Sequence, residues 1–86
     1  MYSLEFLPAA IKDLKKIDKL HQKQIKVKIE LLAKDPSFLK PNIKVLQGKY
    51  HGLCRLRVGN YRVVFQVIDE KVVILIINIG HRKDVY

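Results

Sequence analysis

The chain has 86 residues, of which 49% are hydrophobic, and a formal net charge of +9 from 17 basic and eight acidic side chains. This length suits one small domain, and the apolar content excludes a disordered chain. No apolar run reaches the ~20 residues that a membrane helix needs. The excess of positive charge favours a polyanionic partner such as a nucleic acid. We therefore expect one domain, residues 1–86, that binds a polyanion and no membrane.

The N-terminal residues and the cysteine content indicate a compartment. Met1–Glu5 has no basic region followed by an apolar one, so we expect no signal peptide. The single cysteine, Cys54, excludes an internal disulfide and fits a reducing environment. Its place in the expected strand favours a small buried hydrophobe over a reactive thiol. We expect a cytoplasmic protein.

The N-terminal half predicts one strand and two helices. Tyr2–Phe6 alternates as a short strand does, and Pro8 suits the first turn of a helix. The apolar stripe of this first helix consists of Ile11, Leu14 and Ile17. The stripe of a second helix consists of Ile25, Ile29 and Leu32. One helix from Pro8 to Lys34 would be about 40 Å long, too long for so small a domain. We place a turn at Asp18–His21 and expect an antiparallel helical hairpin.

The middle of the chain predicts irregular structure. The residue before a proline avoids helical geometry, so Asp35 ends the second helix. Ser37–Asn42 is expected to be a loop, and Ile43–Leu46 a short strand or an extended lead. Gln47–Gly52 is expected to be a flexible loop.

The last third predicts three antiparallel strands rich in Val, Ile, Tyr and Phe. They are Leu53–Val58, Tyr61–Ile68 and Val72–Ile79, with turns at Gly59–Asn60 and Asp69–Lys71. The fold class is then α+β, with the order β-α-α-(β)-β-β-β. We expect a mostly antiparallel sheet with the helical hairpin packed on one face.

The Gly59–Asn60 turn predicts the register of the first two of these strands. A two-residue turn puts Arg57 opposite Arg62, and opposed residues share a face of the sheet. The predicted cationic face holds Arg55, Arg57, Arg62 and Gln66, with Val64 among them. The predicted core face holds Leu56, Val58, Tyr61, Val63, Phe65 and Val67, and continues into Val72, Ile74 and Ile76. Leu75, Ile77 and Ile79 then fall on the cationic side.

Like charges across a ladder are unfavourable, so Arg57 opposite Arg62 indicates an anion between them. A phosphate fits best, because the planar guanidinium matches its oxygens. The alternative is a solvated outer face that only keeps the sheet soluble.

The candidate chemistry is cationic and independent of metal. His21, His51 and His81 show no metal-ligand spacing, so we expect no metal and no cofactor. The basic and titratable residues are Arg55, Arg57, Arg62, Arg82, Lys83, His81, Tyr86, Lys49 and His51. Metal-free RNA cleavage needs such a set: a base takes the 2′-OH proton, cations stabilise the phosphorane, and an acid protonates the leaving oxygen. Arginine stays charged, so proton transfer falls to a tyrosine, histidine or lysine.

Several segments resemble the RelE branch of the RelE/ParE toxins. They are Gly59–Phe65, Ile68–Val73, Gly80–Tyr86, Phe6–Ala10 and Lys44–Gly48. The resemblance covers essentially the whole chain and implies the toxin of a type II toxin–antitoxin pair. Such a toxin cuts mRNA in the ribosomal A site and is neutralised by a small antitoxin.

Carried over by position, the resemblance implies roles for individual residues. Arg62 would contact the scissile phosphate, Arg82 would stabilise the transition state, and Tyr86 would orient or deprotonate the 2′-OH. Arg55 stands where RelE has a lysine, and Leu53 stands where it has a second one. Further RNA or phosphate contacts are expected from Arg57, Lys49, His81 and Lys83.

The implied partners are a cognate antitoxin, mRNA and the ribosome, with 16S rRNA contacted through the basic surface. The toxin alone is expected to be a monomer. Because a lysine is missing, Lys49, His51 and His81 are alternative proton carriers. Two other functions stay open: a ParE-like inhibitor of DNA gyrase, and a basic RNA-binding module without catalysis.

Overall fold

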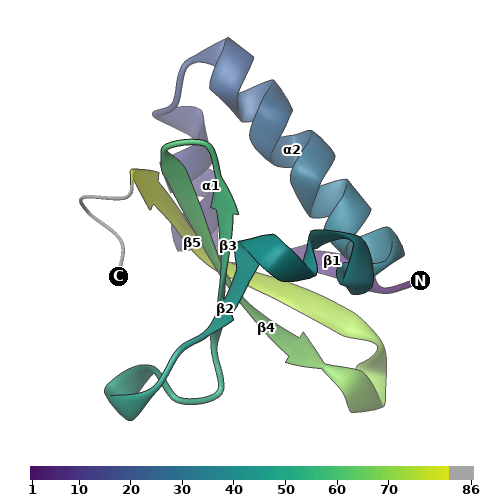
Figure 1. Ribbon diagram of the computed structural model, residues 1–86. Coiled ribbons are helices and arrows are strands. Elements are labelled where there is room, and N and C mark those ends of the chain that lie inside the picture. Colours follow the sequence, from purple (N-terminus) through teal and green to yellow (C-terminus); the bar gives the residue numbers. More distant parts are fainter. Residues whose placement is uncertain (82–86) are drawn as a thin grey trace.

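The computed structural model describes residues 1–81, apart from the side chain of Phe38. A five-stranded sheet is covered on one face by two helices (Figure 1). The helices are α1 (Pro8–Lys15) and α2 (Lys19–Lys34). The strands are β1 (Ser3–Phe6), β2 (Ile43–Val45), β3 (Cys54–Val58), β4 (Tyr61–Ile68) and β5 (Val73–His81). None of the described helices is long and apolar enough to cross a bilayer.

The strands are arranged in the order β1-β5-β4-β3-β2. The contact between β1 and β5 is parallel, and the other three are antiparallel. This confirms the predicted α+β class and the mostly antiparallel sheet. The first and last strands are neighbours, so the sheet joins the two ends of the described chain.

The main core lies between the helices and the sheet. Its fully buried large side chains include Ile25, Ile29 and Leu32 of α2, together with Leu56, Val63, Phe65, Ile74 and Ile76 of the sheet. The predicted stripe of α2 is therefore confirmed. In α1 the buried residue is Ala10 at 0% exposure, and Ile11 is 45% exposed, which corrects the predicted stripe by one position. Leu14 of α1 and Ile17, which follows the helix, are partly buried and pack against the main core as predicted.

The two helices run in opposite directions, as predicted, but the turn between them lies earlier than Asp18–His21 (Figure 1). Asp18 is the N-cap of α2 and its carboxylate accepts a hydrogen bond from the backbone N–H of His21. A side-chain acceptor at this position satisfies a backbone donor that has no partner within the helix. His21 therefore belongs to the first turn of α2.

Two connecting segments are more ordered than predicted. Pro36–Asn42, expected to be a loop, forms a 3₁₀ helix whose first turn is capped by the Asp35 carboxylate. Gly48–Tyr50, expected to be part of a flexible loop, forms a short 3₁₀ turn. Of the two alternatives for Ile43–Leu46, a short strand or an extended lead, the structure has the strand, as β2 (Ile43–Val45).

The last strand differs from its prediction at both ends. Val72, expected to be a core residue, has φ +54° in the left-handed region and is 47% exposed, so β5 begins one residue later. A β-bulge shifts the register between Val64 and Phe65, where Asn78 and Ile76 are the partners. The extra residue in β5 reverses the alternation beyond it. Ile79 consequently lies in the main core at 3% exposure, not on the cationic side as predicted.

Candidate nucleic-acid interface

The hairpin of β3 and β4 sets the positions of the three arginines. Arg57 pairs with Arg62 and Arg55 with Val64, as predicted from the turn. Gly59 has φ +59°, and the following Asn60 is not among the residues with positive φ. Positive φ at the first central residue alone is the type II′ pattern, whose twist matches that of the two strands. The turn therefore fixes the alignment of the arginines through local geometry.

A groove of about 290 Å³ lies on this face of the sheet, away from the helices. It is lined by Pro41, Asn42, Ile43, Lys44, Arg55, Arg57 and Arg62. Every charged side chain in this set is a cation. Arg57 is exposed, whereas Arg55 and Arg62 are partly buried. Arg62 also donates from Nη1 to the carbonyl oxygen of Tyr61 at 3.2 Å. We call this set the cationic groove.

Lys44 is the groove residue that sequence reasoning did not assign to the site. It lies on β2 directly opposite Arg55. No short turn connects β2 to β3, so their register could not be read from the sequence as it was for the hairpin. The available signal for placing Lys44 on this face was the alternation of apolar Ile43, polar Lys44 and apolar Val45.

The other half of this face is apolar. Val64 is fully buried and packs with Leu46, and the cluster also includes Tyr50, Leu53 and Ile77. The segment between β2 and β3 thus folds onto the sheet through its own side chains. Leu53, the position at which the resemblance implies a lysine in RelE, contributes apolar contact to this cluster and no charge.

Lys49 lies in this segment and not in the lining of the groove. Its Nζ is 5.2 Å from the centre of the Tyr50 ring, a cation–π distance. His51, the next residue but one, is exposed. Neither side chain is placed against the arginines in the described structure.

His81 lies on the opposite face of the sheet from the cationic groove. It pairs with Tyr61, and the two ring centres are 5.7 Å apart. The Tyr61 ring is in turn 5.3 Å from the ring of His21. The bulge in β5 explains this placement, because it puts His81 on the same side as Ile79. Among the predicted site residues, His81 is therefore separated from the three arginines.

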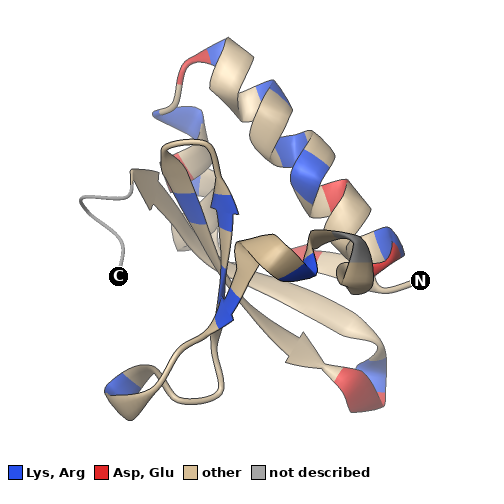
Figure 2. Cartoon of the chain, viewed as in Figure 1, with Lys and Arg blue, Asp and Glu red and all other residues tan. Residues whose placement is uncertain are grey.

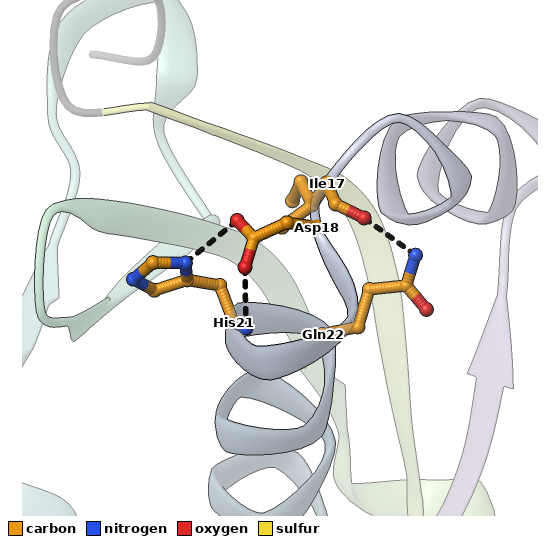
Figure 3. A network of polar contacts seen from close by, with 4 residues as sticks. All are labelled: Ile17, Asp18, His21 and Gln22. Atoms are coloured by element: carbon orange, nitrogen blue, oxygen red, sulfur yellow. Dashed lines mark hydrogen bonds and ion pairs between the residues drawn. The ribbon is translucent and has the colours of Figure 1, made fainter.

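A polar network anchors this helical side. His21 Nδ1 is 2.7 Å from Asp18 Oδ1, and Gln22 Nε2 donates to the carbonyl of Ile17 at 2.6 Å (Figure 3). The side-chain hydrogen bond with His21 holds the pKa of the Asp18 carboxyl below its ordinary value. Asp13 of α1 accepts a hydrogen bond from the backbone N–H of Ile79 at 3.0 Å. The Asp13 contact attaches α1 to the end of β5, and the other contacts fix the turn between the two helices.

The remaining residues singled out in the sequence are three at the C-terminal end and Cys54. Arg82, Lys83 and Tyr86 lie outside the described residues. Cys54 packs against the main core, and burial raises the pKa of its thiol, which lowers its reactivity. Within residues 1–81, no group of His, Cys, Asp and Glu side chains has the arrangement of a metal site.

The distribution of charge over the molecule is uneven. Figure 2 shows basic residues on β3 and β2 and a second series along α2, whereas the acidic residues lie at the turn after β4 and at separate points on and beside α2. The exposed basic residues of α2 are Lys19, Lys23, Lys26, Lys28 and Lys34. The cationic groove is thus part of a broadly basic surface.

Comparisons with known proteins agree with this fold. The family model described as "ParE toxin of type II toxin-antitoxin system, parDE" matches residues 4–86. The mRNA interferase toxin RelE of Escherichia coli K12 is 33% identical over 82 residues, covering 95% of this chain and 84% of the relative. Toxin RelE3 of Methanocaldococcus jannaschii is 36% identical over 83 residues, covering 94% and 91%.

Solved structures show the same architecture. The toxin in the intact E. coli RelBE toxin–antitoxin complex has a TM-score of 0.75 and 35% identity, with 94% of this chain and 96% of that chain covered. RelBE2 from Mycobacterium tuberculosis has a TM-score of 0.80 and 25% identity, with 94% and 98% covered. With a family match over nearly its whole length, the chain belongs to the ParE toxin family of type II toxin–antitoxin systems, and within that superfamily it is a RelE-like toxin.

Proposed function

We propose that the chain is a ribosome-dependent endoribonuclease that cleaves mRNA in the ribosomal A site and so inhibits translation. The observation that supports this most is the cationic groove, where Arg55, Arg57 and Arg62 converge from two paired strands. The relatives named mRNA interferase are similar over most of their length. A cytoplasmic location follows from the substrate, because mRNA and ribosomes are there.

The proposed chemistry is attack of a 2′-OH on the adjacent phosphorus, which forms a 2′,3′-cyclic phosphate and breaks the bond to the 5′ oxygen of the next nucleotide. A base takes the proton of the 2′-OH, and an acid protonates the leaving 5′ oxygen. The phosphate gains negative charge in the transition state, and fixed cations stabilise it more than they stabilise the ground state. Arg62 contacts the scissile phosphate, with Arg55 beside it. Arg82 adds a further charge, and Tyr86 orients or deprotonates the 2′-OH, as the resemblance implies. No metal ion is required in this scheme.

Proton transfer is the step in which this chain departs from RelE. Arginine at position 55 cannot act as an acid or a base near neutral pH. Leu53 lies in the apolar cluster and offers no proton. We assign proton transfer to Tyr86 first, as the resemblance implies. Lys49 and His51 are the alternatives, because their segment packs on the face of the sheet that carries the arginines. His81, on the helical side, is the weakest of these candidates.

The test is cleavage of a defined mRNA on programmed ribosomes, with the 5′ ends of the products mapped. Arg62→Ala is expected to lower the rate about 100- to 1,000-fold, the usual effect of removing one group that stabilises a developing anion. Lys71→Ala is the matched control, because Lys71 lies in the turn at the other end of β4. An intact message with the wild-type protein would refute the proposal.

We also propose a cognate antitoxin as partner. Structural relatives are toxin–antitoxin complexes in E. coli, M. tuberculosis and Pyrococcus horikoshii. Here α2 exposes Leu20 at 63% and Val27 at 54% among its lysines, and β2 exposes Val45 at 63%. An acidic amphipathic segment would match this surface in charge and polarity. Co-purification of the chain with the product of an adjacent gene tests this, with Leu20→Glu/Val27→Glu expected to break the complex.

A second candidate is inhibition of DNA gyrase, which the name of the matching family model favours. It predicts stalled gyrase–DNA complexes and untouched mRNA. Both assays on the same preparation distinguish the two functions. Salt-sensitive RNA binding without cleavage would instead indicate a binding module.

A further inference from the structure

We infer that the cationic groove holds two successive phosphates of a single RNA strand, and that Lys44 with Arg55 forms the second phosphate site. This inference rests on the proposed function, in which Arg62 contacts the scissile phosphate with Arg55 beside it. It adds that Arg57, which is paired with Arg62, shares this first phosphate, and that Arg55 also reaches the next one. It adds Lys44, on the edge strand β2, to the residues that bind RNA.

The first argument is the register of three strands. Lys44 is opposite Arg55 across β2 and β3, and Arg57 is opposite Arg62 across β3 and β4. Opposed residues share a face, so the four cations form two pairs on the same side of the sheet. All four line the same groove.

The second argument is the spacing of the two pairs. Arg55 and Arg57 are two residues apart on β3, which separates the pairs by about 6.7 Å along the strand. The pairs are also displaced by one strand, about 4.8 Å across the sheet. The cations therefore follow an oblique line from β4 to β2. This distance between the two cation pairs suits neighbouring phosphates of an extended RNA strand, because the long side chains of the cations can adjust by a few ångströms.

The third argument is the composition of the groove. Its other lining residues, Pro41, Asn42 and Ile43, are uncharged, so every charged side chain in the lining is a cation. Such a lining favours an anionic ligand along its whole length, including the end at β2.

A lysine on an edge strand has a structural explanation as well, since it discourages pairing with another sheet. That role concerns β2 alone and does not depend on the number of phosphates in a ligand. The two explanations can therefore be separated by varying the ligand.

The experiment compares two 2′-O-methyl oligonucleotides, which cannot be cleaved by 2′-OH attack. A dinucleotide has one phosphate linkage and a trinucleotide has two. Binding to the intact chain is measured by NMR titration at low salt, where weak contacts are strongest. We expect the wild-type protein to bind the trinucleotide about fivefold more tightly than the dinucleotide, the contribution of one exposed charge-assisted contact.

Lys44→Gln is expected to abolish this fivefold preference while leaving dinucleotide binding nearly unchanged. Lys44→Arg should restore the preference, and Lys71→Gln should keep it. Arg57→Gln should weaken both ligands. A tetranucleotide should gain little over the trinucleotide, because the groove has two pairs.

The outcomes separate the inference from the proposed function. A preference that survives Lys44→Gln, or that Lys71→Gln removes equally, overturns the second phosphate site and leaves the first intact. If neither Lys44→Gln nor Arg57→Gln changes the affinity for the two oligonucleotides, the groove is not an RNA site at all. If Lys44→Gln abolishes binding of both the dinucleotide and the trinucleotide, Lys44 acts at the first phosphate, which also contradicts the inference.

Discussion

Replacing Arg57 by glutamine should make the free protein more stable while weakening its hold on RNA. Arg57 lies opposite Arg62 and two residues from Arg55, so it is repelled from two sides. Glutamine keeps most of the side-chain stem and its hydrogen-bonding groups but removes the charge. A surface selected only for stability would not keep this arrangement. The variant thus measures what the cationic groove costs the fold.

The expected gain follows from the geometry of the hairpin. Side chains directly across a strand pair begin about 5 Å apart, and those two residues along begin about 6.7 Å apart. In water-like surroundings the combined repulsion is about 1.2 kcal/mol at 0.01 M salt and about 0.7 kcal/mol at 0.15 M. For a domain of this size, 1 kcal/mol corresponds to a rise in Tm of about 4–8 °C.

The assay is thermal unfolding of the isolated chain at 0.01, 0.15 and 1 M NaCl. Arg57→Gln should raise Tm by about 5 °C at the lowest salt, and the gain should disappear at the highest, where charges are screened over about 3 Å. Lys71→Gln should show no such gain, because Lys71 follows Asp69 and Glu70. Added phosphate should stabilise the wild-type protein more than the variant. A Tm that is unchanged or lower at 0.01 M would refute the argument that the arginines repel each other.

Three further predictions concern stability. On α2, Ile29→Ala should lower the free energy of unfolding by about 3 kcal/mol in urea, whereas Val27→Ala should cost less than about 1 kcal/mol, because Ile29 is 1% exposed and Val27 is 54% exposed; equal losses would contradict the assigned face. Val72→Gly should be about 0.5–1 kcal/mol more stable than Val72→Ala, since only the latter keeps a Cβ at φ +54°; the reverse order would exclude strain at this turn. The hydrogen bond with His21 lowers the pKa of Asp18 in the folded protein. The stability from this contact is therefore present above the unfolded pKa of about 3.9 and is lost as pH falls through the folded pKa. Asp18→Asn should flatten that part of a profile of stability against pH, and an unchanged profile would assign the acid sensitivity to other carboxyls.

The parts of the fold that the sequence predicted correctly depend on local geometry. The pairing of Arg57 with Arg62 follows from a turn of two residues, in which little else can vary. The buried stripe of α2 follows from the regular spacing of large apolar residues. In α1 the small Ala10 is buried in place of the larger Ile11, because the helix packs close to β5 and its phase is set by that contact. Side-chain size alone could not indicate this.

The errors at the site have one physical source. The bulge in β5 adds one residue and reverses which side chains face the core from that point onward. It moves Ile79 into the core and places His81 beside Tyr61, away from the arginines. A bulge reflects how a strand fits its neighbours on both sides, so the sequence of β5 by itself did not reveal it. The position of Lys44 was missed for a similar reason, because its partner strand is not joined to it by a tight turn.

The parallel contact between β1 and β5 has a consequence for synthesis of the chain. Ser3 pairs with Val73, so the earliest strand to leave the ribosome must wait for the last one. Closing a loop of this length costs conformational entropy, and until it closes β1 has an open edge and α1 lacks the strand against which it packs. A nascent chain therefore cannot assemble its complete sheet until β5 has left the ribosome. The fold of the toxin is completed only at that point.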